Sequence, residues 1–221
     1  MPGFRILSMN DLWRILMVLT TVTSLGQMAN SQQRVSIDQN TTFTAPDRAF
    51  WFSYPSDFQI CKAGKIAPCL QGFIPVCEDD ALVCVIYPSK RFEDTNIGAV
   101  SFQVREIHRE EAMMTPDICA TPYTDTGSTY PDFLVSAEHP VEMIDGFQFL
   151  HGLTGDAATS HSLGVDLYRR FHKQRCFELR VSTSATSPAV SDPPVKTLSP
   201  AQQKQLDQSM SQILHSFRFP K

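Results

Sequence analysis

The sequence predicts one α+β domain: a central antiparallel sheet covered by helices, with a C-terminal helix followed by a short strand. Three observations predict this class: several segments alternate apolar and polar residues, short polar turns join them, and one amphipathic helical pattern lies near the C-terminus. A chain of 221 residues, 42% of them hydrophobic and 19% charged, suits a single globular domain. We place that disulfide-linked domain at residues 46–221.

The N-terminus has the pattern of a secretory signal peptide, residues 1–31. Two arginines accompany the apolar run ILMVLTTVTSLG, and small residues predict cleavage after Gly26 or after Ser31. As a helix the run spans about 18 Å, less than the roughly 30 Å hydrocarbon core, so we expect no stable membrane insertion once the leader is removed. Residues 32–45 then form a polar N-terminal arm. The mature protein is expected to be extracytoplasmic, either secreted or periplasmic.

The charge of the chain speaks against an electrostatic partner. The formal net charge is −4, and no long run of one sign occurs. Nucleic acid and anionic membranes are bound through clustered lysines and arginines, so we expect no nucleic-acid partner. An unknown protein or small molecule remains as the partner, and no pattern in the chain indicates a cofactor.

Six cysteines in an exported chain predict three disulfides. Four of them lie in the stretch CKAGKIAPCLQGFIPVCEDDALVC, with seven, seven and six residues between them. Zinc ligands come in close pairs with two to four residues between them, and no CxxC pair occurs, so disulfides are favoured over a metal site or a redox centre. The disulfide candidates are Cys61, Cys69, Cys77, Cys84, Cys119 and Cys176.

A hairpin argument narrows the pairing of these cysteines. Residues 58–61 and 82–87 have strand patterns and are expected to pair in antiparallel fashion, which places Cys61 opposite Cys84. The loop between them then pairs Cys69 with Cys77, and Cys119 is left for Cys176. Closing that last loop, more than fifty residues long, stabilises the fold by about 4 kcal/mol on the chain-entropy model.

Further strand patterns follow in chain order. Residues 50–54 and 100–104 alternate apolar and polar side chains, and residues 141–183 form a meander with turns at Asp145-Gly146 and at the HKQR stretch. From there to Ser199 the composition shifts to Ser, Thr, Ala and Pro, which is typical of a loop.

The clearest helix begins after Ser199. Ser199 is a suitable N-cap, Pro200 suits the first helical position, and Gln202 completes a capping box. Its apolar stripe is expected to face the sheet and consists of Leu206, Met210, Ile213, Leu214 and Phe217. A shorter helix, which carries Cys119, is expected between Thr115 and Pro122.

Three stretches together resemble the PsbP-like superfamily. They are FWFSYPSDF near the start of the domain, the Gly-x-x-Leu-Tyr element from Gly164 to Tyr168, and the Ser-Phe-x-Phe ending from Ser216 to Phe219. The superfamily includes the extrinsic photosystem protein, a Ran-binding nuclear-import factor and uncharacterised bacterial secreted proteins. The resemblance implies a PsbP-like α/β/α sandwich and a binding or assembly role rather than catalysis. The cysteine-rich insert is not part of the family pattern.

Short enzymatic motifs are absent from the sequence. No histidine pair has HxH, HxxxH or HExxH spacing, and no GxSxG, glycine-rich phosphate loop or SxxK occurs. A cation site made of His151, His161 and Asp156 is conceivable across a turn, but half-exposed histidines without a ligand are the favoured interpretation. We therefore predict no catalytic, cofactor-binding or metal residues. The predicted function is an exported non-catalytic binding or assembly module. The alternative is a secreted hydrolase whose site is assembled from distant residues.

Overall fold

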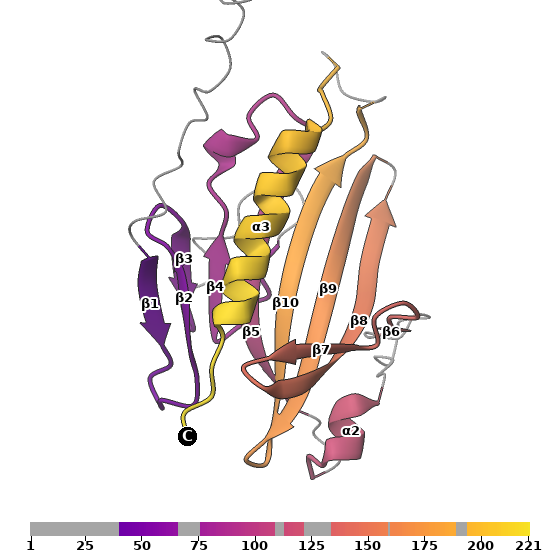
Figure 1. Ribbon diagram of the computed structural model, residues 1–221. Coiled ribbons are helices and arrows are strands. Elements are labelled where there is room, and N and C mark those ends of the chain that lie inside the picture. The colour runs from indigo at the N-terminus through magenta and orange to yellow at the C-terminus, as the bar shows by residue number, and fades with distance from the viewer. Residues whose placement is uncertain (1–39, 66–75, 109–112, 122–133, 159, 189–193) are drawn as a thin grey trace, which may run out of the picture. The chain divides into compact units, whose positions relative to one another are not determined.

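A computed structural model describes residues 40–65, 76–108, 113–121, 134–158, 160–188 and 194–221 (Figure 1). The predicted signal peptide, both cleavage positions and Cys69 lie outside these ranges. Within them, no helix has the length and apolar character needed to cross a membrane.

An eight-stranded sheet, antiparallel throughout, forms the centre of the described fold (Figure 1). Its strand order is β3-β4-β5-β10-β9-β8-β6, and β7 also pairs with β8. The predicted meander is confirmed, because β7, β8, β9 and β10 are successive antiparallel neighbours. The strands are β3 (Gln59–Lys62), β4 (Val83–Ile86), β5 (Ile97–Ile107), β6 (Leu134–Val135), β7 (Val141–Ile144), β8 (Phe147–Ala158), β9 (His161–His172) and β10 (Arg175–Thr186).

Two tight turns fix the register of the meander. Asp145 and Gly146 join β7 to β8 with φ values of 52° and 75°, and Lys173 and Gln174 join β9 to β10 with 46° and 64°. Positive φ at both central residues is the geometry of a type I′ turn, whose twist matches that of antiparallel strands. Both turns lie where the sequence predicts them.

The N-terminal boundary of the fold differs from the prediction. Residues 40–44, which we placed in the polar arm, form β1 (Asn40–Thr44) and pair with β2 (Trp51–Pro55) in a separate two-stranded sheet. Phe43 is buried and packs against the rings of Phe50 and Phe52, 6.0 and 5.4 Å away. One aromatic residue among threonines is therefore enough to anchor a strand in this otherwise polar stretch.

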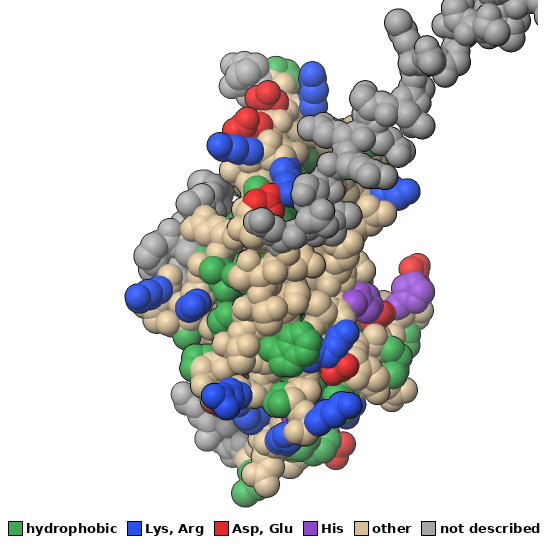
Figure 2. All heavy atoms as spheres, turned by 60° about the vertical axis from the view of Figure 1, so that its left-hand side comes forward, with side chains coloured by type: hydrophobic (Ala, Val, Ile, Leu, Met, Phe, Trp, Pro, Cys, Tyr) green, Lys and Arg blue, Asp and Glu red, His purple; other side chains and the backbone are tan. Residues whose placement is uncertain are grey.

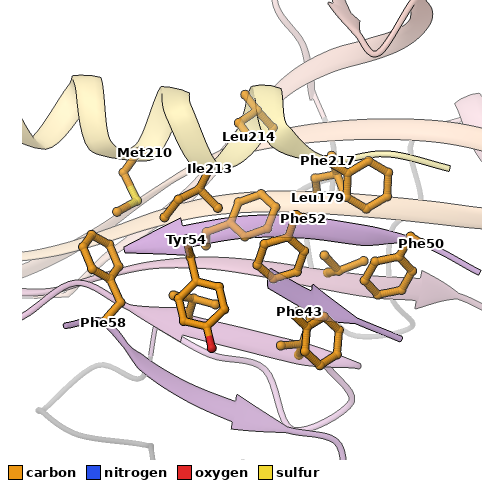
Figure 3. Packing of buried hydrophobic residues seen from close by; sticks show 14 of the residues in the cluster. Phe43, Phe50, Phe52, Tyr54, Phe58, Leu179, Met210, Ile213, Leu214 and Phe217 are labelled. Atoms are coloured by element: carbon orange, nitrogen blue, oxygen red, sulfur yellow. The ribbon is translucent and has the colours of Figure 1, made fainter. Parts of the chain in front are cut away.

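Helix α3 (Pro200–Ser216) covers one face of the sheet, which we call the apolar face (Figure 1). The predicted capping box of Ser199 and Gln202 is present. In Figure 3, Met210 and Ile213 point from α3 toward the aromatic side chains of β2 and the sheet. The predicted stripe is confirmed, and its buried members are Leu206, Met210, Ile213, Leu214 and Phe217.

The strand predicted after α3 is reduced to one residue. Arg218 forms an isolated bridge with Trp51, with backbone hydrogen bonds in both directions at 3.0 and 2.8 Å. Pro220 has no N–H to extend such a ladder, which accounts for the difference.

The opposite face of the sheet carries buried polar side chains, and we call it the polar face. A carboxylate at its centre, Glu178, lies 2.6 Å from Arg169 Nε, 3.6 Å from Arg105 Nη1 and 3.8 Å from Arg180 Nε. The described helix on this side is the short α2 (Pro116–Ala120), which carries Cys119. The predicted antiparallel sheet is present, and its predicted helical cover is found only in part: the 17-residue α3 lies on one face and, among the described residues, the five-residue α2 on the other.

The cysteine-rich insert is attached to the polar face through its described end. Arg180 Nη1 donates to Glu78 Oε1 at 2.7 Å, and Arg105 Nη2 donates to Asp80 at 2.8 Å. The amide of Glu78 also donates to Gln103 Oε1 at 2.9 Å. The polar face therefore serves as the docking surface for the insert.

The disulfides confirm one predicted pair and correct two. Cys119 is bonded to Cys176 as predicted. Cys84 lies opposite Cys61 in the sheet as expected, but its bond goes to Cys77, so the predicted pairs of Cys61 with Cys84 and of Cys69 with Cys77 are wrong. Directly opposed residues in antiparallel strands hold their Cβ atoms about 4.5–5.5 Å apart, at or beyond the usual range for a disulfide. Cys61 is itself disulfide-bonded, and no cysteine among the described residues is free.

Candidate functional site

One edge of the central sheet is formed by β6 and β7, which pair with successive parts of β8. Between them the chain makes a bulge, residues 136–140, opposite His151. Ser136 N–H donates to the carbonyl of His151 at 3.0 Å, and His151 N–H donates to the carbonyl of Pro140 at 3.0 Å. The two short strands therefore act as one interrupted edge strand. Bulges of this kind are frequent at sheet edges and beside functional sites.

Large apolar side chains are exposed along this edge. Leu134 and Leu153 face each other across the strands and are 53% and 47% exposed. Alternation along a strand sends neighbouring side chains to opposite faces, so the apolar surface wraps around the edge. Exposed apolar surface of this kind marks interaction sites when it is contiguous. We call these residues the edge patch: Leu134, Val135, Val141, Met143 and Leu153.

His151 lies directly behind the edge. Its Nδ1 is 2.8 Å from the carbonyl oxygen of His139 in the bulge, and its Nε2 is 3.0 Å from Asp166 Oδ1 on β9. The ring stacks on Tyr168, with 4.6 Å between centroids. Burial raises the pKa of the Tyr168 hydroxyl, and the charges of Asp166 and Glu142 raise it further, so the phenol stays protonated.

A second histidine connects the edge to the helix. His215, in the last turn of α3, places its Nε2 2.9 Å from Glu142 Oε1 on β7. Its Nδ1 lies 2.8 Å from the carbonyl oxygen of Ser211, one turn earlier in the helix. The edge strand is therefore linked both to β9, through His151, and to α3.

The cation site that seemed conceivable from the sequence is not assembled. His161 Nδ1 lies 3.1 Å from Thr186 Oγ1, and Asp156 accepts a hydrogen bond from the neighbouring amide of Ala157. His151 pairs with Asp166 instead, and no cluster of metal-ligating side chains occurs in the part of the chain that the structure describes. The pair of His151 and Asp166 could have been found from the register of the β8–β9 hairpin, which places them diagonally across two strands.

Concave surface lies elsewhere, around the end of β4. A hollow of about 510 Å³ is lined by Asp57, Gln59 and residues 86–91. The Arg91 guanidinium in this lining is already engaged, since it forms an ion pair with Asp57 at 2.5 Å and lies over the ring of Tyr87. The buried charges around Glu178 are not part of its lining.

Charged side chains of both signs occur on the face of the molecule seen in Figure 2. In Figure 2, Lys and Arg side chains are interspersed with acidic, apolar and neutral surface over the visible face.

Comparison with known proteins gives likenesses in fold. No family model matches the chain, and no curated protein matches it. Solved structures with a similar fold include LpqN of Mycobacterium tuberculosis, involved in cell envelope biogenesis, with a TM-score of 0.40 and 12% identity, covering 82% of this chain and 91% of that one.

Two further structures belong to the relatives expected from the sequence. The cyanobacterial PsbP of Synechocystis sp. PCC 6803 has a TM-score of 0.40 and 10% identity, covering 85% of this chain and 96% of its own. The Ran-binding protein Mog1p of Saccharomyces cerevisiae has a TM-score of 0.39 and 14% identity, covering 82% and 95%. At TM-scores of 0.39–0.40 and identities of 10–14% these are likenesses only, and the PsbP-like resemblance stays a prediction from the sequence.

Proposed function

We propose that the protein is an exported, non-catalytic binding module that contacts a protein partner through the edge patch. One observation carries this proposal: five large apolar side chains are exposed at the β6–β7 edge and the neighbouring part of β8. The register places Leu134 and Leu153 on one face of this edge and Val135, Val141 and Met143 on the other. A protein that presents an apolar surface of its own would bury these side chains, and removal of apolar area from water drives most protein association.

The disulfides support a location outside the cytoplasm. Two bonds, Cys77–Cys84 and Cys119–Cys176, are formed, and both of their sulfur pairs lie in buried surroundings. Such bonds persist in oxidising compartments and are rare in the cytosol. They agree with the signal peptide that the sequence predicts.

The arrangement of buried charges favours binding over hydrolysis. A hydrolase needs titratable groups that converge on a cavity and remain available to a substrate. Here Glu178 is surrounded by three guanidinium groups, and two of these, from Arg105 and Arg180, also hold the insert. These groups stabilise the attachment of the insert, which is a structural task.

Site-specific photo-cross-linking tests the proposal in the cells that export the protein. A photoreactive phenylalanine analogue is placed at Met143 or at Leu153, both exposed in the edge patch, and at Gln208 on the outer side of α3 as the matched control. We expect one shared protein adduct from the two patch positions and none from Gln208.

The same adduct should depend on the apolar character of the patch. Val141→Glu, introduced beside a cross-linker at Met143, adds a charge that binding would have to desolvate, so adduct yield should fall about tenfold. Adducts of equal yield from Gln208, or no protein adduct at either patch position, would overturn the proposal.

A further inference from the structure

The hydrogen bonds of His151 define the protonation state of its ring. A carbonyl oxygen accepts hydrogen bonds and cannot donate, and the same holds for an ionised carboxylate. Nδ1 faces the carbonyl of His139 at 2.8 Å, and Nε2 faces Asp166 at 3.0 Å. Both contacts are hydrogen bonds at the same time only when both ring nitrogens carry a proton, so the arrangement is that of an imidazolium ion.

Groups from β9 and from the bulge enclose the His151 ring. From β9 the carboxylate of Asp166 and the face of the Tyr168 ring contact it, and from the bulge the His139 carbonyl contacts it. The His151 side chain is only 12% exposed, while Asp166 is 47% exposed. A charged hydrogen bond with one well-buried partner is stronger than a neutral one or an exposed ion pair.

His215 forms a second contact of the same type with the edge strand. Its ring lies between Glu142 of β7 and the carbonyl of Ser211, and its own carbonyl accepts a hydrogen bond from Arg218, which pairs with Asp145. The side chains of His215 and Glu142 are 45% and 34% exposed. Solvent screens this pair, so we expect it to contribute less than His151.

We propose that protonation of His151 holds the bulge, residues 136–140, and with it the interrupted edge strand, so that the edge patch is assembled at acidic pH and loosened above neutral pH. This inference rests on the proposed function for its biological meaning, because it concerns the surface to which we assign partner binding. Histidine is the side chain whose charge ordinarily changes between about pH 5 and 8, a range that exported proteins encounter.

The two acceptors, the His139 carbonyl and Asp166, determine which ring nitrogen of His151 loses its proton first. The Asp166 carboxylate accepts the hydrogen bond from Nε2, so the proton lost to water as the pH rises is the one on Nδ1. The Nδ1 lone pair then faces the His139 carbonyl oxygen at 2.8 Å, and the hydrogen bond becomes a repulsion. The bulge is tied to His151 by two backbone hydrogen bonds as well, from Ser136 and to Pro140, so it loosens rather than detaches.

Nuclear magnetic resonance on the purified, partner-free protein tests this inference. Long-range nitrogen-proton spectra report whether each ring nitrogen carries a proton, and amide exchange reports local opening of the bulge. At about pH 5.5 we expect two protons on the His151 ring. Protection factors of the Ser136 and His151 amides should be about two- to tenfold higher there than at about pH 8, the size of one net hydrogen bond.

Two variants separate this effect from general acid or base effects. His151→Gln should abolish the pH dependence of the Ser136 amide, whereas His108→Gln, at a histidine that directly follows β5 and is 76% exposed, should leave it unchanged. A singly protonated His151 ring at about pH 5.5, or equal protection at both pH values in the parent protein, would overturn the inference. The NMR experiment uses the protein without a partner, so its outcome does not depend on the proposed function. Failure of cross-linking at the edge patch would defeat the proposed function but would leave the NMR result on His151 unaffected.

Discussion

The two faces of the sheet are both buried, but different forces hold what covers them. On the apolar face, aromatic and aliphatic side chains from β2, α3 and the sheet form one continuous cluster. On the polar face, Arg105 and Arg180, two of the three arginines around Glu178, hold the insert by charge-assisted hydrogen bonds, and Cys119–Cys176 ties α2 to the same side. A face held by apolar contacts tolerates small losses, whereas a paired buried charge fails when one partner is removed.

The largest loss of stability is expected on the polar face. Glu178 is 1% exposed, and Glu178→Ala would leave the guanidinium groups of Arg105 and Arg169 facing each other without the carboxylate between them. Removing one partner of a buried ion pair costs about 3–5 kcal/mol. Urea unfolding of parent and variant measures the difference.

A compensated variant sharpens that result. Replacing Glu178, Arg169 and Arg180 together by Met or Leu removes the three most deeply buried charges of the network and leaves Arg105 paired with Asp80. Such replacements of buried ion pairs are often neutral or stabilising. A triple variant less stable than Glu178→Ala would show that the network supplies stability beyond the pairing of its charges.

A slightly smaller loss is expected on the apolar face. Ile213 is fully buried in α3, and Ile213→Ala should lower the free energy of unfolding by about 2–5 kcal/mol, because a cavity is left behind. Gln208→Ala, on the exposed side of the same helix, is the matched control and should leave the urea midpoint unchanged. Equal midpoints for both variants and the parent would mean that α3 is not packed on the sheet.

The cap of α3 should contribute less than its packed side chains. Ser199 Oγ accepts a hydrogen bond from the amide of Gln202 at 3.3 Å. Ser199→Ala leaves that amide without its cap and should cost about 1 kcal/mol in a thermal or urea unfolding experiment. Ser199→Asp restores an acceptor and should recover most of the loss.

A weaker, pH-dependent effect is expected at His172. Burial lowers the pKa of His172, and Lys173 and Arg170 lower it further, while its ring stacks on Phe219 at 4.0 Å. The folded protein therefore favours the neutral His172 ring. The stability that this preference contributes is fully present above the ordinary histidine pKa of about 6.5, and it is lost as the pH falls through the lowered pKa of His172 in the folded protein. Between about pH 7 and 5, His172→Phe should lose less stability than the parent protein. An identical slope for both would contradict this assignment.

The apolar face could be predicted from sequence because its signals are local. The capping box around Ser199, the stripe containing Ile213 and the turn at Asp145 each lie within a few residues of their partners. The polar face could not, since Glu78 and Arg180 are 102 positions apart and only the sheet register brings them together. The same limit produced the wrong partner for Cys84, because strand register was predictable but the path of the insert was not.

The edge patch was missed for a related reason. Met143 and Leu153 have the alternating pattern of buried strand residues, and their exposure follows from lying at an edge of the sheet. An edge position depends on the order of strands, which no single segment encodes.

The central claim is that the edge patch serves binding and not folding, and Val141→Glu tests it when stability and partner contact are measured on the same variant. Val141 is 43% exposed, so the free energy of unfolding should stay within about 0.5 kcal/mol of the parent value. The yield of the protein adduct from a cross-linker at Met143 should fall about tenfold. A free energy of unfolding several kcal/mol below that of the parent, as expected for Ile213→Ala, would contradict the claim. An unchanged adduct yield would contradict it as well.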